Sequence, residues 1–204
     1  MIGPARYHAF RYAARALWWL YGGRLEIKGL DNVPANGAVL VFANHQSYLD
    51  PILGQAACPR ILHCMAKSTQ FGSPLFRRIL SWLYSFPVRR FETDPQAVRQ
   101  VLRRLGAGHG VIIYIEGERS WDGRLQPPRL GTVRIALKAG VPIVPCRIDG
   151  AYDAWPRWDR KIKRSLITID FREPLHLPRL ETRAEREAYL AEAADRIMKA
   201  LAPR

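Results

Sequence analysis

Short apolar runs alternate with helix-like segments along most of the chain, and this alternation constrains the fold more than any other feature of the sequence. The apolar runs predict strands at 25–30, 38–43, 61–66, 86–88, 111–115, 142–148 and 166–171. Helical periodicity predicts helices at 51–57, 74–84, 95–107, 130–139 and 182–201. Continuous apolar runs are typical of strands that are buried on both faces. We therefore predict an α/β fold, with a mixed, largely parallel central sheet of about seven strands flanked by helices.

Two prolines bear on the position of one predicted strand. Pro142 and Pro145 bracket the apolar part of the run at 142–148. Proline has no backbone N–H to donate, so within sheets it is found at strand starts, on edge strands or at bulges. We therefore expect this segment to lie at a strand start or at an edge of the sheet.

The first 22 residues form a separate predicted unit. Phe10, Ala14, Leu17 and Tyr21 recur at helical spacing, arginines surround them, and Gly22–Gly23 follows. This pattern predicts an amphipathic helix over 4–21. Such a helix either lies in a lipid headgroup layer or packs on its own domain, and the pattern is compatible with both. We expect a membrane-interface helix at 1–22 and one α/β domain at 23–204.

The predicted helix at 74–84 is a second amphipathic segment. Leu75, Phe76 and Ile79 are apolar at helical spacing, while Arg77 and Arg78 are cationic. The segment could contact lipid or an acyl chain. It could equally be a surface helix that packs its apolar side on the core.

The charge balance indicates an anionic partner. The chain has 32 Lys and Arg against 18 Asp and Glu, a formal net charge of +14. This favours nucleic acid, an anionic membrane surface or phosphorylated substrates as partners. The aromatic residues lie mostly in apolar runs and no nucleic-acid motif is present, so we expect no nucleic-acid partner.

Several features of the sequence bear on where the protein is found. No apolar stretch approaches the roughly 18 residues of a spanning helix, and the N-terminus lacks the pattern of a signal peptide. The three cysteines show no disulfide or metal spacing, as is natural in a reducing compartment. We expect a peripheral protein at the cytoplasmic face of the cell membrane.

The segment NHQSYLD, at 44–50, places polar residues directly after a predicted buried strand. A histidine held by a carboxylate is a general base with a fixed orientation, and His45 and Asp50 could form such a pair. Five positions apart on one regular helix they would not share a face, so a turn must bring them together. Asp50 could cap the next helix with Pro51 after it, or Ser47 could cap it with Asp50 three positions later. Because Pro51 disfavours helical geometry at Asp50, we prefer the first arrangement.

Three further strand ends carry charged residues. The strand at 111–115 runs into Glu-Gly-Glu-Arg-Ser, where Gly117 allows close approach of a ligand and Arg119 offers a planar fork for phosphate. Two adjacent arginines follow the strand at 86–88, and Lys67 follows the strand at 61–66. Ligands of α/β sheets bind outside the carboxyl ends of strands, so these residues are candidates for one site.

Together, four segments resemble the motifs of the glycerolipid acyltransferase family, the bacterial 1-acylglycerol-3-phosphate acyltransferases in particular. The first family motif, NH-x4-D, is matched at 44–50. The second, similar to PVDR, is matched at 87–90, with Arg90 at the arginine position. The third, FPEGTRS, resembles 114–120, and the fourth, VPIVPV, resembles 141–146. The resemblance covers residues 25 to 175.

The chain departs from these motifs at three positions. Arg89 replaces the usual Asp, Ile115 the Pro, and Glu118 the Thr. Glu118 could pair with the adjacent Arg119 or repel a phosphate, and it therefore bears on which acceptor the protein would use.

The resemblance implies an acyltransferase of phospholipid biosynthesis. It would move a fatty acyl group from acyl-CoA or acyl-carrier-protein to the free hydroxyl of lysophosphatidic acid, giving phosphatidic acid. His45 would be the catalytic base and Asp50 its support. The expected substrate-binding residues are Lys67, Arg90, Glu116, Gly117, Arg119 and Arg129.

The same resemblance implies no metal and no cofactor beyond the acyl donor. The expected partners are a lysophospholipid, the acyl-CoA or acyl-carrier-protein donor and an anionic membrane surface. Two alternatives stay open: transfer to another lysophospholipid or lipid-like alcohol, and a non-catalytic membrane-binding domain.

Overall fold

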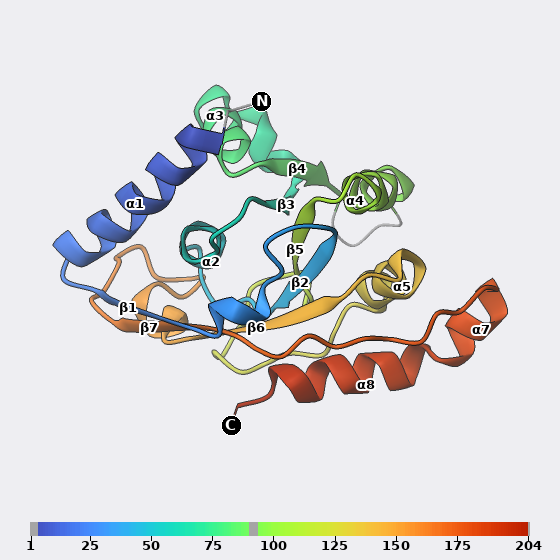
Figure 1. Cartoon of the computed structure of the whole chain (residues 1–204). Coiled ribbons are helices and arrows are strands. Elements are labelled where there is room, and N and C mark those ends of the chain that lie inside the picture. Colours follow the sequence, from blue (N-terminus) through green and yellow to red (C-terminus); the bar gives the residue numbers. More distant parts are fainter. Residues whose placement is uncertain (1–3, 90–93, 204) are drawn as a thin grey trace.

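A seven-stranded sheet forms the centre of the computed structural model, which describes residues 4–89 and 94–203 (Figure 1). The strands are β1 (Arg24–Lys28), β2 (Val39–Ala43), β3 (Leu62–Lys67), β4 (Ser85–Val88), β5 (Gly110–Tyr114), β6 (Ile143–Asp149) and β7 (Leu166–Phe171). Their order is β1-β7-β6-β2-β5-β3-β4. Every pairing is parallel except that of β6 with β7. The predicted mixed, largely parallel sheet is confirmed.

Helices cover both faces of this sheet. They are α1 (Pro4–Leu20), α2 (Asp50–Ala57), α3 (Pro74–Trp82), α4 (Pro95–Gly106), α5 (Leu130–Ala139), α6 (Ala151–Ala154), α7 (Arg183–Ala188) and α8 (Leu190–Leu201). Alternate residues of β2 enter different cores. Val41 packs in a cluster with Leu53 of α2, whereas Phe42 packs in another with Val133 of α5 and Ile197 of α8. No described helix is long and apolar enough to cross a membrane.

Helix α1 packs on the domain along one side and exposes apolar residues on the other. Tyr7 and Trp18 are buried, and the Arg11 guanidinium donates to the carbonyl oxygens of Ala56 and Pro59. Leu17, which belongs to the predicted apolar stripe, is 66% exposed. Phe10 and Ala14 of the same stripe are partly buried, so the stripe lies beside the docking contacts and only its C-terminal part, at Leu17 and Tyr21, is exposed.

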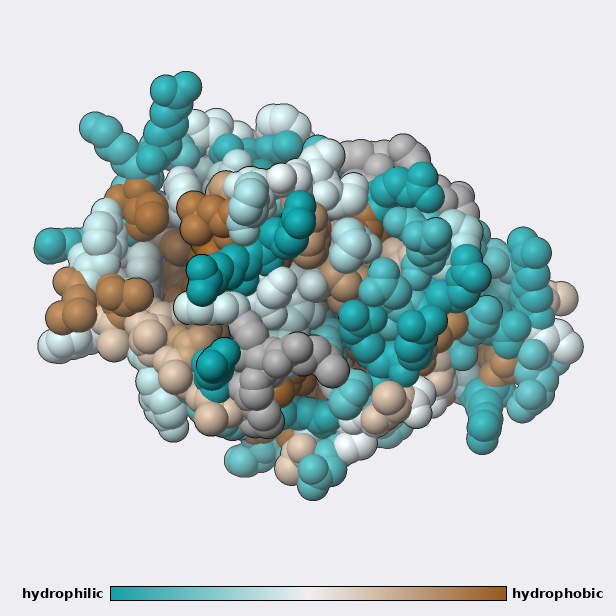
Figure 2. Space-filling view, turned by 90° about the horizontal axis from the view of Figure 1, so that it is seen from above, coloured by the Kyte–Doolittle hydropathy of each residue, from teal (hydrophilic) through white to brown (hydrophobic). Residues whose placement is uncertain are grey.

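Helix α3 buries none of its residues. Its large apolar side chains are exposed, namely Leu75, Phe76, Ile79 and Trp82. Figure 2, which looks down on the side of the molecule where α1 and α3 lie, shows hydrophobic groups at the left among hydrophilic ones. The predicted segment continues to residue 84, and Leu83, just after α3, is 3% exposed. Burial is therefore confined to the end of the segment, while the helix itself leaves its apolar side chains uncovered.

The last predicted helix is divided into two. Tyr189 ends α7 and precedes α8, and Thr182 with Glu185 forms a capping box at the start of α7. In α8, Leu190, Ala194, Ile197 and Leu201 are buried on the domain, as their spacing predicts. The C-terminal segment therefore completes the core on one face of the sheet.

The expectation for the proline-containing strand is only partly right. Pro142 precedes β6, as a strand start requires, but β6 lies between β7 and β2 and is not an edge strand. Pro145 is tolerated inside it because the ladder with β7 begins only at Cys146. The Pro145 carbonyl oxygen accepts the Arg172 N–H at 2.8 Å, so the position still contributes one hydrogen bond.

Candidate active site

A buried histidine–aspartate pair lies in the loop between β2 and α2. His45 Nδ1 is 2.7 Å from Asp50 Oδ2, and the two residues are 4% and 1% exposed. The same carboxylate oxygen accepts the backbone N–H groups of Gln46 and Ser47 at 2.6 and 2.7 Å. These three contacts fix the aspartate and, through it, the orientation of the imidazole ring.

The turn that joins the pair is not the one we preferred from the sequence. Leu49, not Asp50, occupies the N-cap position of α2. Ser47 Oγ accepts the Leu49 N–H at 3.1 Å while Asp50 accepts the Ser47 N–H. These hydrogen bonds are those expected if Ser47 begins the turn and Asp50 lies three positions later, which is the other arrangement that the sequence allows. The Asp50 carboxylate can thus point back to His45, which it could not do as a cap directed at its own helix.

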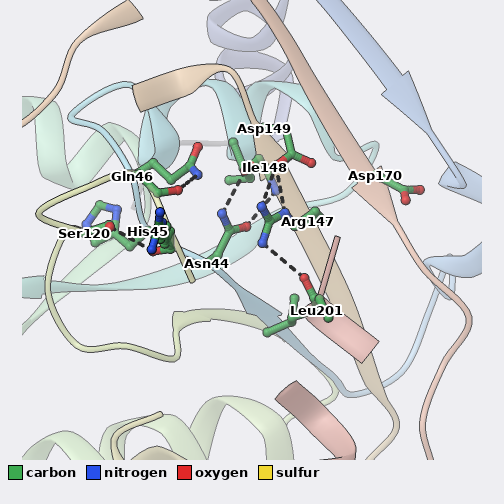
Figure 3. Close-up of polar contacts among 12 residues, drawn as sticks. Asn44, His45, Gln46, Ser120, Arg147, Ile148, Asp149, Asp170 and Leu201 are labelled. Carbon is green, nitrogen blue, oxygen red and sulfur yellow. Dashed lines mark hydrogen bonds and ion pairs between the residues drawn. The ribbon is translucent and has the colours of Figure 1, made fainter. Parts of the chain in front are cut away.

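Asn44 ties the histidine loop to β6. Its side chain accepts the Ile148 N–H and donates to the Ile148 carbonyl oxygen, both at 2.7 Å (Figure 3). Asn44 is completely buried. The Asn44 side chain therefore continues the β2–β6 pairing beyond the end of β2. It holds the backbone of the loop in place directly before His45.

The imidazole of His45 stacks on the ring of Tyr114, the last residue of β5. The ring centroids are 4.3 Å apart with an interplanar angle of 29°. Burial raises the pKa of the Tyr114 hydroxyl well above its ordinary value, so this ring is neutral. Tyr114 had no assigned role in the sequence, although it lies in the third motif.

Glu116 supports the backbone of the histidine. Its two carboxylate oxygens accept the N–H groups of His45 at 2.8 Å and Gln126 at 3.0 Å. The residue is 3% exposed, and burial raises the pKa of its carboxyl group to about 7. Because the side chain is buried and both oxygens bind backbone N–H groups, the structure gives Glu116 a role in positioning His45 and Gln126. The substrate contact expected of Glu116 stays a prediction.

The loop after Glu116 wraps around His45. Ser120 donates its N–H to the His45 carbonyl oxygen at 2.7 Å (Figure 3). Gly117 has φ +76°, and a side chain there would lie 2.7 Å from Cγ of Arg129. Glycine is needed at this position both for the positive φ and for the close approach of the arginine.

Three arginines converge on the same loop. The Arg119 guanidinium lies 3.4 Å above the ring of Tyr48, and Arg157 Nη1 donates to the Arg119 carbonyl oxygen. Glu118 pairs with Arg129 at 3.4 Å and with Arg157 at 3.2 Å. Of the two possibilities raised by the sequence, direct pairing of Glu118 with Arg119 is not what the structure shows.

The remaining expected substrate-binding residues lie elsewhere or are not described. Lys67 is exposed at the end of β3. Arg90 falls outside the described residues. Arg157 was not identified from the sequence, because it lies far from every motif and reaches the site only through the fold. Within 4–89 and 94–203, no cluster of three or more His, Cys, Asp or Glu could hold a metal.

An open groove of about 1280 Å³ is lined in part by Tyr114, the residue on whose ring His45 stacks. Gly117 and Arg129, from the loop around His45 and the start of α5, also line it. Its apolar lining comes from strands and helices on one face of the sheet: Met65, Val88, Val98, Leu102, Ile113 and Ile135. Its cationic lining comes chiefly from α4, α5 and α7: Arg99, Arg134, Lys138, Arg183 and Arg186. The groove therefore suits a molecule with a long apolar part and anionic groups.

Comparison with known proteins gives a consistent result. A protein-family model described as Acyltransferase matches residues 24–149. A chloroplastic 1-acyl-sn-glycerol-3-phosphate acyltransferase of Brassica napus is 30% identical over 165 residues, which cover 79% of this chain and 47% of that protein. A protein of the same enzyme name from Borreliella burgdorferi is 27% identical over 131 residues, covering 62% and 52%. The chain spans about half the length of the curated relatives it matches.

The fold also resembles a solved structure. The crystal structure of the 1-acyl-sn-glycerophosphate (LPA) acyltransferase PlsC from Thermotoga maritima superposes with a TM-score of 0.75 and 22% identity. The match covers 97% of this chain and 81% of that one. This likeness extends over the sheet, the helices on both faces and the N-terminal part of the chain.

Proposed function

The chain belongs to the acyltransferase family, and from this premise we propose that it transfers a fatty acyl group to the free hydroxyl of lysophosphatidic acid. The product is phosphatidic acid, and the process is phospholipid biosynthesis. The observation that carries the proposal is the buried His45–Asp50 pair, with 2.7 Å between Nδ1 and Oδ2. Relatives named 1-acyl-sn-glycerol-3-phosphate acyltransferases support the choice of acceptor.

His45 acts as the general base in this proposal. Asp50 holds the proton of the imidazole at Nδ1, so that Nε2 is the atom that removes the proton from the acceptor hydroxyl. The alkoxide oxygen attacks the thioester carbonyl carbon, and the C–S bond breaks. The thiolate takes the proton back from Nε2 and leaves as a thiol. Proton transfer of this kind contributes about 10²–10⁴-fold to a rate.

The groove supplies a place for the substrates. Its apolar lining accommodates an acyl chain, and its cationic lining attracts the phosphates of an acyl-CoA or acyl-carrier-protein donor. In this proposal, Arg119, Arg129 and the backbone at Gly117 bind the acceptor headgroup. Lys67 and Arg90 remain predicted contacts. No metal and no prosthetic group takes part in the proposed mechanism.

A peripheral position at the cytoplasmic face of the cell membrane fits the exposed surface of the first helix. Tyr12, Trp19 and Leu20 of α1 are 67%, 71% and 70% exposed. Tryptophan and tyrosine are enriched at the headgroup level of membranes, and cations near an anionic surface contribute about 1 kcal/mol each. The net charge of +14 favours this partner.

Replacing Trp19 and Leu20 together by serine is expected to weaken membrane binding at least ~tenfold, because two apolar side chains no longer enter the interface. Cosedimentation with phosphatidylglycerol-containing vesicles measures the effect. Leu166→Ser, which removes an exposed leucine at the start of β7, is the control and should bind as the unmodified protein does. Equal binding of all three proteins would contradict the membrane role of α1.

The experiment that tests the acceptor is thiol release from acyl-CoA in the presence of different acceptors. Lysophosphatidic acid, lysophosphatidylglycerol, lysophosphatidylethanolamine and glycerol-3-phosphate are compared at equal concentrations. The proposal expects the fastest release with lysophosphatidic acid. Faster release with another acceptor would identify a different lysolipid acyltransferase. No release with any acceptor, from acyl-CoA or from acyl-carrier-protein, would favour a non-catalytic membrane-binding domain.

A further inference from the structure

Glu118 places a negative charge between two arginines of the candidate site. Its Oε1 is 3.4 Å from Nη2 of Arg129, and its Oε2 is 3.2 Å from Nη1 of Arg157. The carboxylate is 30% exposed, so it is neither buried in the core nor fully surrounded by water. The motif FPEGTRS, which this loop resembles, has threonine at this position, so Glu118 adds a charge that the motif does not contain.

The carboxylate and the arginines are connected directly to the loop that holds His45. Arg157 also donates to the carbonyl oxygen of Arg119, and the Arg129 side chain packs against Gly117. One residue further on, Ser120 donates its N–H to the His45 carbonyl oxygen at 2.7 Å. A headgroup that binds these arginines while its glycerol hydroxyl reaches His45 must therefore lie close to Glu118.

We propose that Glu118 limits the negative charge that the acceptor headgroup can carry. This inference rests on the proposed function. A phosphomonoester carries about −1.5 to −2 charges at pH 7, whereas a phosphodiester carries one. The second charge of the monoester meets repulsion from Glu118, and two of the arginines that would neutralise it already share the carboxylate. Glu118 therefore reduces the preference of the site for monoester over diester lysolipids, without reversing it.

The variant E118Q removes the charge and keeps the shape of the side chain. The ratio of kcat/KM for lysophosphatidic acid to kcat/KM for lysophosphatidylglycerol is expected to rise about tenfold, for one repulsive charge partly screened by solvent. E187Q is the matched control. Glu187 pairs with Arg134 at 2.8 Å in the same groove but away from the histidine loop, so its variant should leave the ratio unchanged.

The assay uses short-chain lysolipids that are dispersed as monomers, so that membrane binding does not influence the ratio. An unchanged ratio in E118Q, or equal losses with both acceptors, would overturn the inference and leave Glu118 with only a structural role. A rise of the ratio in E187Q as large as in E118Q would also overturn it, because the effect would then be one of overall charge.

A second measurement separates this inference from the proposed function. If the unmodified protein releases no thiol with either acceptor, the proposed function has failed. The ratio of the Kd values of the two lysolipids, measured by calorimetry for E118Q and the unmodified protein, then tests the inference alone. A shift of about tenfold toward the monoester supports it, and equal ratios overturn it.

Discussion

Asp50→Asn is expected to lower kcat/KM by about 10²–10⁴-fold, because the base loses the charge that stabilises its protonated form. The Asp50 Oδ2 atom accepts hydrogen bonds from the His45 ring and from the backbone N–H groups of Gln46 and Ser47. If the amide NH₂ of asparagine occupied the position of Oδ2, it would face three N–H donors and could form no hydrogen bond with them. An amide oxygen there could still accept from them, but it would carry no full negative charge.

The measurement is steady-state thiol release together with the urea dependence of unfolding. Asp195→Asn is the control, since Asp195 makes an exposed pair with Lys199 on α8 and the chemical change is the same. A folded Asp50→Asn protein with the activity of the unmodified one would show that the carboxylate does not support the base. A protein that fails to fold would be replaced by Asp50→Glu, which retains the charge but displaces it, and whose activity should also fall.

Asn44→Ala is expected to lower the free energy of unfolding by about 2–6 kcal/mol. The substitution leaves the buried N–H and carbonyl oxygen of Ile148 without the partners that Asn44 now provides at 2.7 Å. Each unsatisfied buried polar group costs about 1–3 kcal/mol. The loss should be seen in urea unfolding, with an unchanged slope that indicates the same surface exposed on unfolding.

Asn32→Ala is the matched control for this prediction. Asn32 makes one side-chain hydrogen bond, to the Phe171 carbonyl oxygen at 2.9 Å, in a partly buried place. Its loss is expected to cost about 1 kcal/mol. Equal effects of the two substitutions would mean that Asn44 has no special part in holding the histidine loop on β6.

The order of strands and helices along the chain could be predicted because each strand of the central sheet is marked in the sequence by a short apolar run. The strand at 166–171 and the helix at 130–139 are found at the predicted residues. The sequence could not show which neighbour each strand has, and this is why the segment with Pro142 and Pro145 is predicted to lie at a strand start or at an edge. Pro145 is tolerated inside β6 because the β6–β7 ladder does not include it. The extent of that ladder depends on contacts between distant parts of the chain.

The candidate site was predictable where its residues are close in sequence. His45 and Asp50 do meet, and Gly117 and Arg119 lie on a loop bonded to His45. The contacts of Glu116 were not predictable, because they join it to the backbone of a residue far away in the sequence.

One further neighbour of His45, Tyr114, follows from the register of the sheet, which the structure supplies and the sequence does not. In the pairing of β2 with β5, Ala43 lies beside Tyr114, one residue before the Asn-His of the loop. Parallel pairing of these two strands therefore places Tyr114 near His45. By contrast, Arg157 follows α6 and no pattern in the sequence connects it with Glu118.

The central claim is that His45 drives acyl transfer to a lysolipid hydroxyl, and one measurement tests it most directly. Purified protein and the His45→Ala variant are incubated with acyl-CoA and lysophosphatidic acid, and the phosphatidic acid formed is measured by mass spectrometry. The account predicts product with the unmodified protein and a loss of about 10²-fold or more in a folded His45→Ala variant. Equal product from both proteins would contradict the account.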